Sequence, residues 1–138
     1  MPTPWYAISN AAEVPSPALL VYPERVEENI RRMIAVAGGV GRLRPHMKTS
    51  KIPEVVRMHV DQGITRYKVA TIAEAEMAAE AGAPDVLLAY QPVGPNIDRF
   101  VRLITAFPRT VFSALVDDEG NARLVSCLLY TSDAADEL

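Results

Sequence analysis

Residues 66–90, RYKVATIAEAEMAAEAGAPDVLLAY, decide the fold because two short apolar runs flank one amphipathic segment. Residues 66–70 and 85–90 are rich in Val, Tyr and Leu, which favours strands. Between them Thr71 precedes a helical run, and Glu74 completes a capping-box pattern three residues later. A glycine and a proline follow this run and end the helix. The stretch therefore predicts a βαβ unit with two parallel strands.

The same alternation continues on both sides of this unit. The expected elements are an extended segment at 17–22, a helix from Pro23 to Gly38-Gly39, strand 42–46, helix 52–62, helix 96–107, strand 110–116 and a helix start near Asp117. Near-continuous apolar runs at 86–89 and 111–115 are typical of parallel strands covered on both faces. Four such strands are half of a (β/α)₈ barrel, which typically needs about 250 residues. An open doubly wound sheet is the alternative.

The helix that starts at Pro23 is expected to be amphipathic. Its apolar face holds Val26, Ile30, Met33, Ile34 and Ala37. The opposite face carries two pairs of opposite charge at i,i+4 spacing, Glu27 with Arg31 and Glu28 with Arg32. Residues at this spacing are neighbours on a helix surface, so we expect both pairs to form on the solvent side.

One segment, Arg44-Pro45-His46-Met47-Lys48-Thr49-Ser50-Lys51, links the expected strand 42–46 to the next helix. Lys48 therefore follows a strand, at the end of an α/β sheet where such folds usually carry chemistry. Arg44 and Lys51 are cationic neighbours that would favour a neutral, nucleophilic amine, as partial burial would. A solvated surface lysine is the alternative interpretation.

Four separated blocks occur in the order Arg44-Pro45-His46-x-Lys48-Thr49, Thr71-Ile72-Ala73-Glu74-Ala75-Glu76, Gly82-Ala83-Pro84-Asp85-Val86-Leu87-Leu88-Ala89 and Val93-Gly94-Pro95. Together they resemble the D-threonine aldolase and D-serine dehydratase group, fold-type III enzymes that use pyridoxal 5′-phosphate (PLP). The resemblance runs from Ser16 to about Asp118. It favours a partial (β/α)₈ barrel of the alanine racemase N-terminal type and implies that Lys48 forms the internal aldimine. It also implies an N-terminal fragment that lacks the family's C-terminal β-domain.

In such a barrel, residues that follow consecutive strands share one mouth, here Lys48, Thr71, Gln91 and Asp117. His46 lies two residues before Lys48 on the same side of a strand, so we expect it near the PLP ring. A core histidine bonded to backbone is the alternative for His46. Gln91 is a candidate for a cofactor or substrate contact. Thr71 is expected to cap its helix, and Asp117 to favour a helix N-terminus.

Other parts of a complete site are not expected in this chain. The glycine-rich residues 37–41 end a helix, whereas a phosphate cradle needs a loop that opens one. His46 and His59 lack Cys or carboxylate partners at ligand spacing, so no metal is assigned. The resemblance places the phosphate loops and a divalent metal in later parts of the intact protein. Ser50, where many family members have histidine, is expected to cap the following helix.

The resemblance implies that the parent protein is a PLP-dependent lyase acting on β-hydroxy D-amino acids, either as a D-threonine aldolase or as a D-serine dehydratase. An amino-acid racemase on the same scaffold and a PLP-homeostasis protein that binds the cofactor without turnover are the alternatives. A homodimeric parent is one option. We expect the isolated chain to be inactive and marginally stable, because a half-barrel leaves two strand edges unpaired.

The last residues have a different expected origin. Residues 127–137, CLLYTSDAADE, resemble a translated sequencing adapter. Residues 1–126 are then the N-terminal part of the PLP-binding barrel domain, and residues 127–138 a non-native tail. Removing the tail's three acidic residues from the chain's 17 leaves 14 acidic against 14 basic residues, which changes the net charge from −3 to zero.

This composition excludes several classes of protein. A neutral balance without basic blocks argues against nucleic-acid binding. The only cysteine lies in the tail, which leaves no disulfide. No apolar run is long enough to span a membrane, and the N-terminus does not resemble a signal peptide. A cytoplasmic protein with a small-molecule amino-acid substrate is therefore expected.

Overall fold

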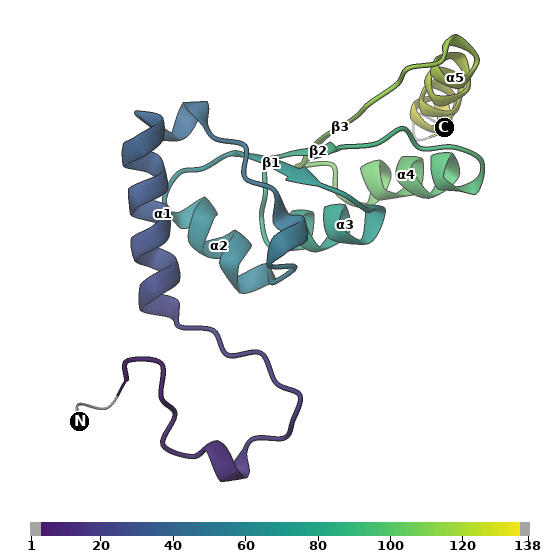
Figure 1. Cartoon of the computed structure of the whole chain (residues 1–138). Helices are drawn as coiled ribbons and strands as arrows, with labels where there is room; N and C mark the ends of the chain where they lie inside the picture. Colours follow the sequence, from purple (N-terminus) through teal and green to yellow (C-terminus); the bar gives the residue numbers. More distant parts are fainter. Residues whose placement is uncertain (1–3, 136–138) are drawn as a thin grey trace.

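A parallel sheet lies at the centre of the computed structural model, which describes residues 4–135 (Figure 1). Its strands are β1 (Arg66–Val69), β2 (Asp85–Leu88) and β3 (Val111–Ala114), in this order across the sheet. Tyr67 pairs with Val86, and Val86 pairs with Phe112, so the strand ends are level. Helix α3 (Ile72–Glu80) joins β1 to β2, and α4 (Pro95–Ala106) joins β2 to β3. The predicted βαβ units are confirmed.

Helices cover one face of this sheet. Figure 1 shows α2 (Pro53–Asp61), α3 and α4 on the same side. Side chains of β1 and β2 that point to this side are fully buried: Tyr67, Val69, Val86 and Leu88. The alternate residues on the other face are only half-buried: Arg66, Lys68, Asp85 and Leu87. The expectation of strands covered on both faces is therefore wrong for residues 4–135, because all three helices pack on one side.

A regular fourth strand at residues 42–46 does not form, and this prediction is wrong. Val40–Arg42 is a short 3-10 helix, and His46 alone makes a parallel bridge, to Lys68. The backbone N–H of Lys68 donates to the carbonyl of Pro45 at 2.9 Å. Pro45 has no N–H to return, so it interrupts a ladder. The segment lies along the outer edge of β1 without forming a regular strand.

Helix α1 (Pro23–Ala37) begins and ends where its sequence predicts. Pro23 occupies the first helical position, and Gly38 takes the left-handed conformation, with φ 73°, that ends the helix. Ile30 is buried in the core, and Val26 and Met33 pack beside it. The apolar face predicted from the spacing is therefore confirmed.

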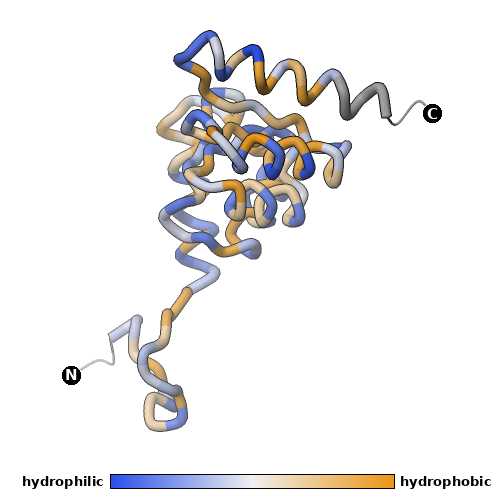
Figure 2. The backbone as a smooth tube through the Cα atoms, turned by 90° about the vertical axis from the view of Figure 1, so that its right-hand side faces the viewer, coloured by the Kyte–Doolittle hydropathy of each residue, from blue (hydrophilic) through white to orange (hydrophobic). Residues whose placement is uncertain are grey.

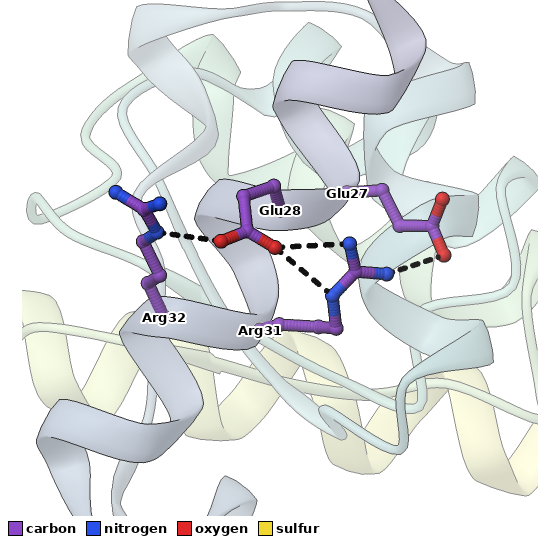
Figure 3. Close-up of polar contacts among 4 residues, drawn as sticks. All are labelled: Glu27, Glu28, Arg31 and Arg32. Atoms are coloured by element: carbon purple, nitrogen blue, oxygen red, sulfur yellow. Dashed lines mark hydrogen bonds and ion pairs between the residues drawn. The ribbon is translucent and has the colours of Figure 1, made fainter.

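The opposite face of α1 carries the predicted ion pairs (Figure 3). Arg31 contacts Glu27 at 3.0 Å and Arg32 contacts Glu28 at 2.7 Å. Arg31 also contacts Glu28 at 3.0 Å, so the two pairs join into one network. The hydrogen bonds from Arg32 and Arg31 hold the pKa of Glu28 below its usual value. All four side chains are exposed to solvent.

The chain before α1 lies away from the body of the fold (Figure 1). The Trp5 ring contacts the Tyr22 ring, and the Arg25 guanidinium lies 4.5 Å from the Trp5 centroid. Figure 2 shows a hydrophobic stretch where this segment joins the body. Residues 19–21, just before α1, are Leu, Leu and Val, and Leu19 and Leu20 are 76% and 46% exposed. Residues 17–22 form no helix and pair with no strand within residues 4–135.

Helix α5 (Glu119–Ala135) packs beside α4 and starts close to the predicted position. The Asp118 side chain accepts from the Asn121 N–H at 2.8 Å, which caps the helix. The helix continues into the segment predicted to be a non-native tail. The origin of that segment stays a prediction, because residues of either origin can extend a helix. None of the helices in the described residues is long and apolar enough to cross a membrane.

Candidate functional site

Lys48 lies in the short 3-10 helix Met47–Thr49, directly after the residue that bridges to β1. Met47 points into the core and is 3% exposed, which anchors this turn. Lys48 itself is exposed and makes no ion pair within residues 4–135. The turn follows the same end of the sheet as the loops after β1 and β2, as the sequence predicted. Its amine is therefore accessible and uncommitted.

Arg44 fixes the start of this segment to the sheet. Its guanidinium donates to both carboxylate oxygens of Asp85, at 2.8 and 2.9 Å, and to the carbonyl of Tyr67 at 3.1 Å. Both side chains are about 30% exposed, and bidentate pairs of this kind are geometrically specific. Arg44, expected as a cationic neighbour of Lys48, is thus paired with the Asp85 carboxylate, which offsets its charge.

Lys51 fixes the end of the segment to α3. Its ammonium lies 3.2 Å from Glu74, whose side chain is only 6% exposed. The other Glu74 oxygen accepts from the Ala70 N–H at 2.8 Å. Lys51 also has φ 52°, an uncommon backbone conformation for a residue with a side chain. A carboxylate thus pairs with Lys51 too, and the predicted effect of the two cations on Lys48 stays a prediction.

Of the two hydrogen bonds of the capping box predicted at the start of α3, one forms as predicted. The Thr71 side chain accepts from the Glu74 N–H at 3.1 Å, as predicted for an N-cap. In a standard capping box the Glu74 carboxylate would bond the Thr71 N–H. Here it bonds the Ala70 N–H one residue earlier, because it also reaches Lys51.

His46 is half-buried and bonds to backbone, as in the alternative interpretation of its sequence. Its Nδ1 accepts from the Lys48 backbone N–H at 3.3 Å, so it caps the turn that carries Lys48. Burial lowers its pKa, the nearby charges of Lys48 and Lys68 lower it further, and Glu74 opposes them. The imidazole is therefore neutral at pH 7. The predicted contact with the PLP ring stays a prediction.

Sequence reasoning missed Lys68. It lies on β1, half-buried, on the sheet face that no helix covers, opposite His46 in the bridge. No carboxylate pairs with it within residues 4–135. The alternation of Tyr67 and Val69 toward the core could have placed Lys68 on the other face. Lys68 lies next to His46 because the two residues form an isolated bridge, which the sequence pattern of residues 42–46 does not predict.

Gln91 and Asp117 connect two loops at the same end of the sheet. The Gln91 side-chain oxygen accepts from the Asp117 N–H at 2.8 Å. Nearby, the buried Asn121 donates to the carbonyl of Pro92 at 2.9 Å. Gln91 thus holds the loop after β2 to the loop after β3. Its contact with cofactor or substrate stays a prediction, as does the expectation for Asp117.

Ser50 does not cap α2, and this prediction is wrong. The N-cap position is Ile52, and no side chain caps the helix there. The left-handed turn at Lys51 separates Ser50 from the helix start. The Ser50 hydroxyl is instead buried without a hydrogen-bond partner among residues 4–135.

Side chains cap two of the helices that follow this end of the sheet and leave two uncapped. At α3 the Thr71 side chain accepts from the Glu74 N–H, and at α5 the Asp118 side chain accepts from the Asn121 N–H. No side chain within residues 4–135 caps α2 or α4. Among the described residues, no three His, Cys, Asp or Glu side chains gather as a metal site. What these residues do supply is an accessible amine beside a neutral imidazole, a pair suited to attack on an aldehyde.

Comparisons with known proteins agree on one group of enzymes. The chain is 39% identical over 75 residues to D-threo-3-hydroxyaspartate dehydratase from Delftia sp. (strain HT23). That match covers 54% of the chain and 20% of the dehydratase. The fold matches the crystal structure of D-threonine aldolase from Filomicrobium marinum with a TM-score of 0.77 and 27% identity. This match covers 89% of the chain and 33% of the aldolase. No family model matches.

Proposed function

Because this chain is a partial barrel of the D-threonine aldolase and D-serine dehydratase-like, fold-type III family, we propose that its parent protein is a PLP-dependent lyase acting on β-hydroxy D-amino acids. The observation that carries the proposal is the agreement of two independent likenesses, one in sequence and one in fold. The two matched enzymes are named for a 3-hydroxyaspartate and for threonine, which both carry a hydroxyl on the β-carbon. The chain spans a fifth and a third of their lengths.

Lys48 is proposed to hold PLP through a Schiff-base link to its Nζ. Three features of this chain fit that role: Lys48 follows the sheet's carboxyl end, its amine is exposed, and no carboxylate of the described residues neutralises it. When bound, PLP acts as an electron sink that stabilises negative charge at the substrate Cα. The phosphate cradle and a divalent metal belong, in this proposal, to the rest of the parent protein.

The residues around Lys48 then have separate tasks. Arg44 and Lys51 hold the two ends of the turn, through Asp85 and Glu74. His46 holds the Lys48 backbone from inside the turn. The Lys48 amine would then be the group that takes or returns a proton at the substrate Cα. The contacts of Arg44, Lys51 and His46 contribute by fixing the position of this amine.

Borohydride trapping tests this assignment directly. The chain has only three lysines, Lys48, Lys51 and Lys68. Incubation with PLP and reduction should place the pyridoxyl group on Lys48, detected by peptide mass spectrometry. Lys48→Ala should abolish this label, and Lys51→Ala should retain it. In the full-length parent, Lys48→Ala should also remove the visible absorbance of bound PLP and the cleavage of D-threonine or D-serine. Equal labelling of all three lysines would refute the role of Lys48.

A further inference from the structure

Two lysines lie next to His46: Lys68 on the uncovered face of the sheet and Lys48 in the adjoining turn. Of the three lysines, Lys51 is paired with Glu74, whereas Lys48 and Lys68 have no ion pair within residues 4–135. Lys68 is the bridge partner of His46, and the Lys48 backbone N–H donates to the His46 ring, so both lysines lie close to this imidazole. The Glu74 carboxylate also acts on His46, but it is already paired with Lys51. The two unpaired positive charges favour the binding of an anion.

The backbone fixes Lys68 in this cluster. His46 and Lys68 are bridge partners, and the Lys68 N–H donates to Pro45 at 2.9 Å. Bridge partners in parallel strands point their side chains to the same face of a sheet. On its other side Lys68 pairs in register with Leu87, which offers no charge. The carboxylate of Asp85, at the start of β2, is bound to Arg44.

The position beside Lys48 selects the kind of anion. If Lys48 carries the cofactor, as proposed above, the amino group of the substrate would lie near its Nζ. Only the Cα atom separates that nitrogen from the substrate carboxylate. The phosphate of PLP is joined through a longer chain of atoms on a neighbouring ring carbon. A cation that shares an imidazole with Lys48 therefore meets the carboxylate first.

We propose that Lys68 binds the α-carboxylate of the amino-acid substrate beside Lys48. The inference rests on the proposed function for the identity of the anion, but the anion site itself does not require a Schiff base. Lys68 is then a substrate-binding residue that orients Cα relative to the Lys48 amine. A charge-assisted hydrogen bond of this kind strengthens binding more than a neutral one does.

His46 serves as a reporter for the test, because the chain has only two histidines and His59 is a buried internal control. The pKa of each imidazole is measured by NMR with acetate or inorganic phosphate at constant ionic strength. Acetate should raise the pKa of His46, since an added negative charge favours the imidazolium. The response should persist in Lys68→Arg and vanish in Lys68→Met. Arg66→Met, on the same face of β1, is the matched control and should respond like the unchanged chain.

Three results would overturn the inference: no acetate response in the unchanged chain, an equal response in Lys68→Met, or a Lys68-dependent response to phosphate that exceeds the response to acetate. Circular dichroism of each variant establishes that it is folded. Because acetate forms no Schiff base, these results are independent of borohydride trapping at Lys48. In the full-length parent, Lys68→Met should raise KM for the amino acid by about 10- to 100-fold, with a smaller change in kcat. An unchanged KM there would also overturn it.

Discussion

Two sets of ion pairs in this chain both join basic to acidic side chains, but they have different structural roles. On α1, Arg31 and Arg32 contact Glu27 and Glu28 within one turn of helix, on a solvent-exposed face (Figure 3). Around Lys48, the pairs connect residues far apart in sequence. Arg44 reaches across 41 positions to Asp85. The first set lies on the surface of a helix that does not depend on it, and the second fixes the turn that carries Lys48.

Burial separates the energetics of the two sets. The α1 side chains stay hydrated, and exposed pairs of this kind add little to stability. Glu74 is 6% exposed and serves two partners, Lys51 and the Ala70 N–H. Removing a buried acceptor leaves its donor without a partner, which costs more than losing a surface pair. The contribution of an ion pair to stability therefore depends on the other hydrogen bonds that its carboxylate accepts.

The largest effect is expected at Glu74. Glu74→Ala leaves the Ala70 N–H and Lys51 without their acceptor, and should lower the free energy of unfolding by about 2 kcal/mol. Urea denaturation measures this. Glu76→Ala, exposed on the same helix, is the matched control and should change stability by less than about 0.5 kcal/mol. Equal effects at both positions would mean that the buried Glu74 stabilises the fold no more than an exposed carboxylate does.

An intermediate effect is expected at Arg44. Arg44→Met keeps the length of the side chain but removes the bidentate contact with Asp85, and should cost about 1 kcal/mol because the pair is only half-buried. Hydrogen exchange followed by mass spectrometry should show faster exchange in the segment that carries Lys48. If exchange there is unchanged, Arg44 does not hold the turn.

The smallest effect is expected on α1. Glu28→Gln removes the negative charge that pairs with both Arg31 and Arg32, yet all three side chains are hydrated. Thermal unfolding at physiological salt should give the same Tm as the unchanged chain, because salt screens such pairs. A drop in Tm comparable to that of Arg44→Met would mean that the α1 network stabilises the fold as much as the long-range pairs do.

The elements that depend on residues close in sequence were predicted correctly. The βαβ order, Pro23 and Gly38 at the ends of α1, and Thr71 as an N-cap follow from short-range chemistry and are confirmed. The pairs on α1 were predictable for the same reason. Helix periodicity places both partners on one face before any tertiary contact forms.

The site was less predictable because its contacts join distant segments. No local rule pairs Arg44 with Asp85 or brings Lys68 to His46. The strand expected at residues 42–46 failed at Pro45, whose missing N–H interrupts a ladder that the apolar pattern alone allowed. The resemblance to a known family made Lys48 a candidate, and the tertiary contacts show that its cationic neighbours Arg44 and Lys51 are paired with Asp85 and Glu74.

The outer edge of β3 has a practical consequence. Within residues 4–135 this strand pairs with β2 alone, and Val111 on it is 67% exposed. The backbone N–H and C=O groups on its outer edge can pair with a further strand. A separately produced polypeptide that supplies the complementary strands of the barrel should dock there. The chain therefore suits a split-protein design, in which reassembly of two pieces restores a closed ring.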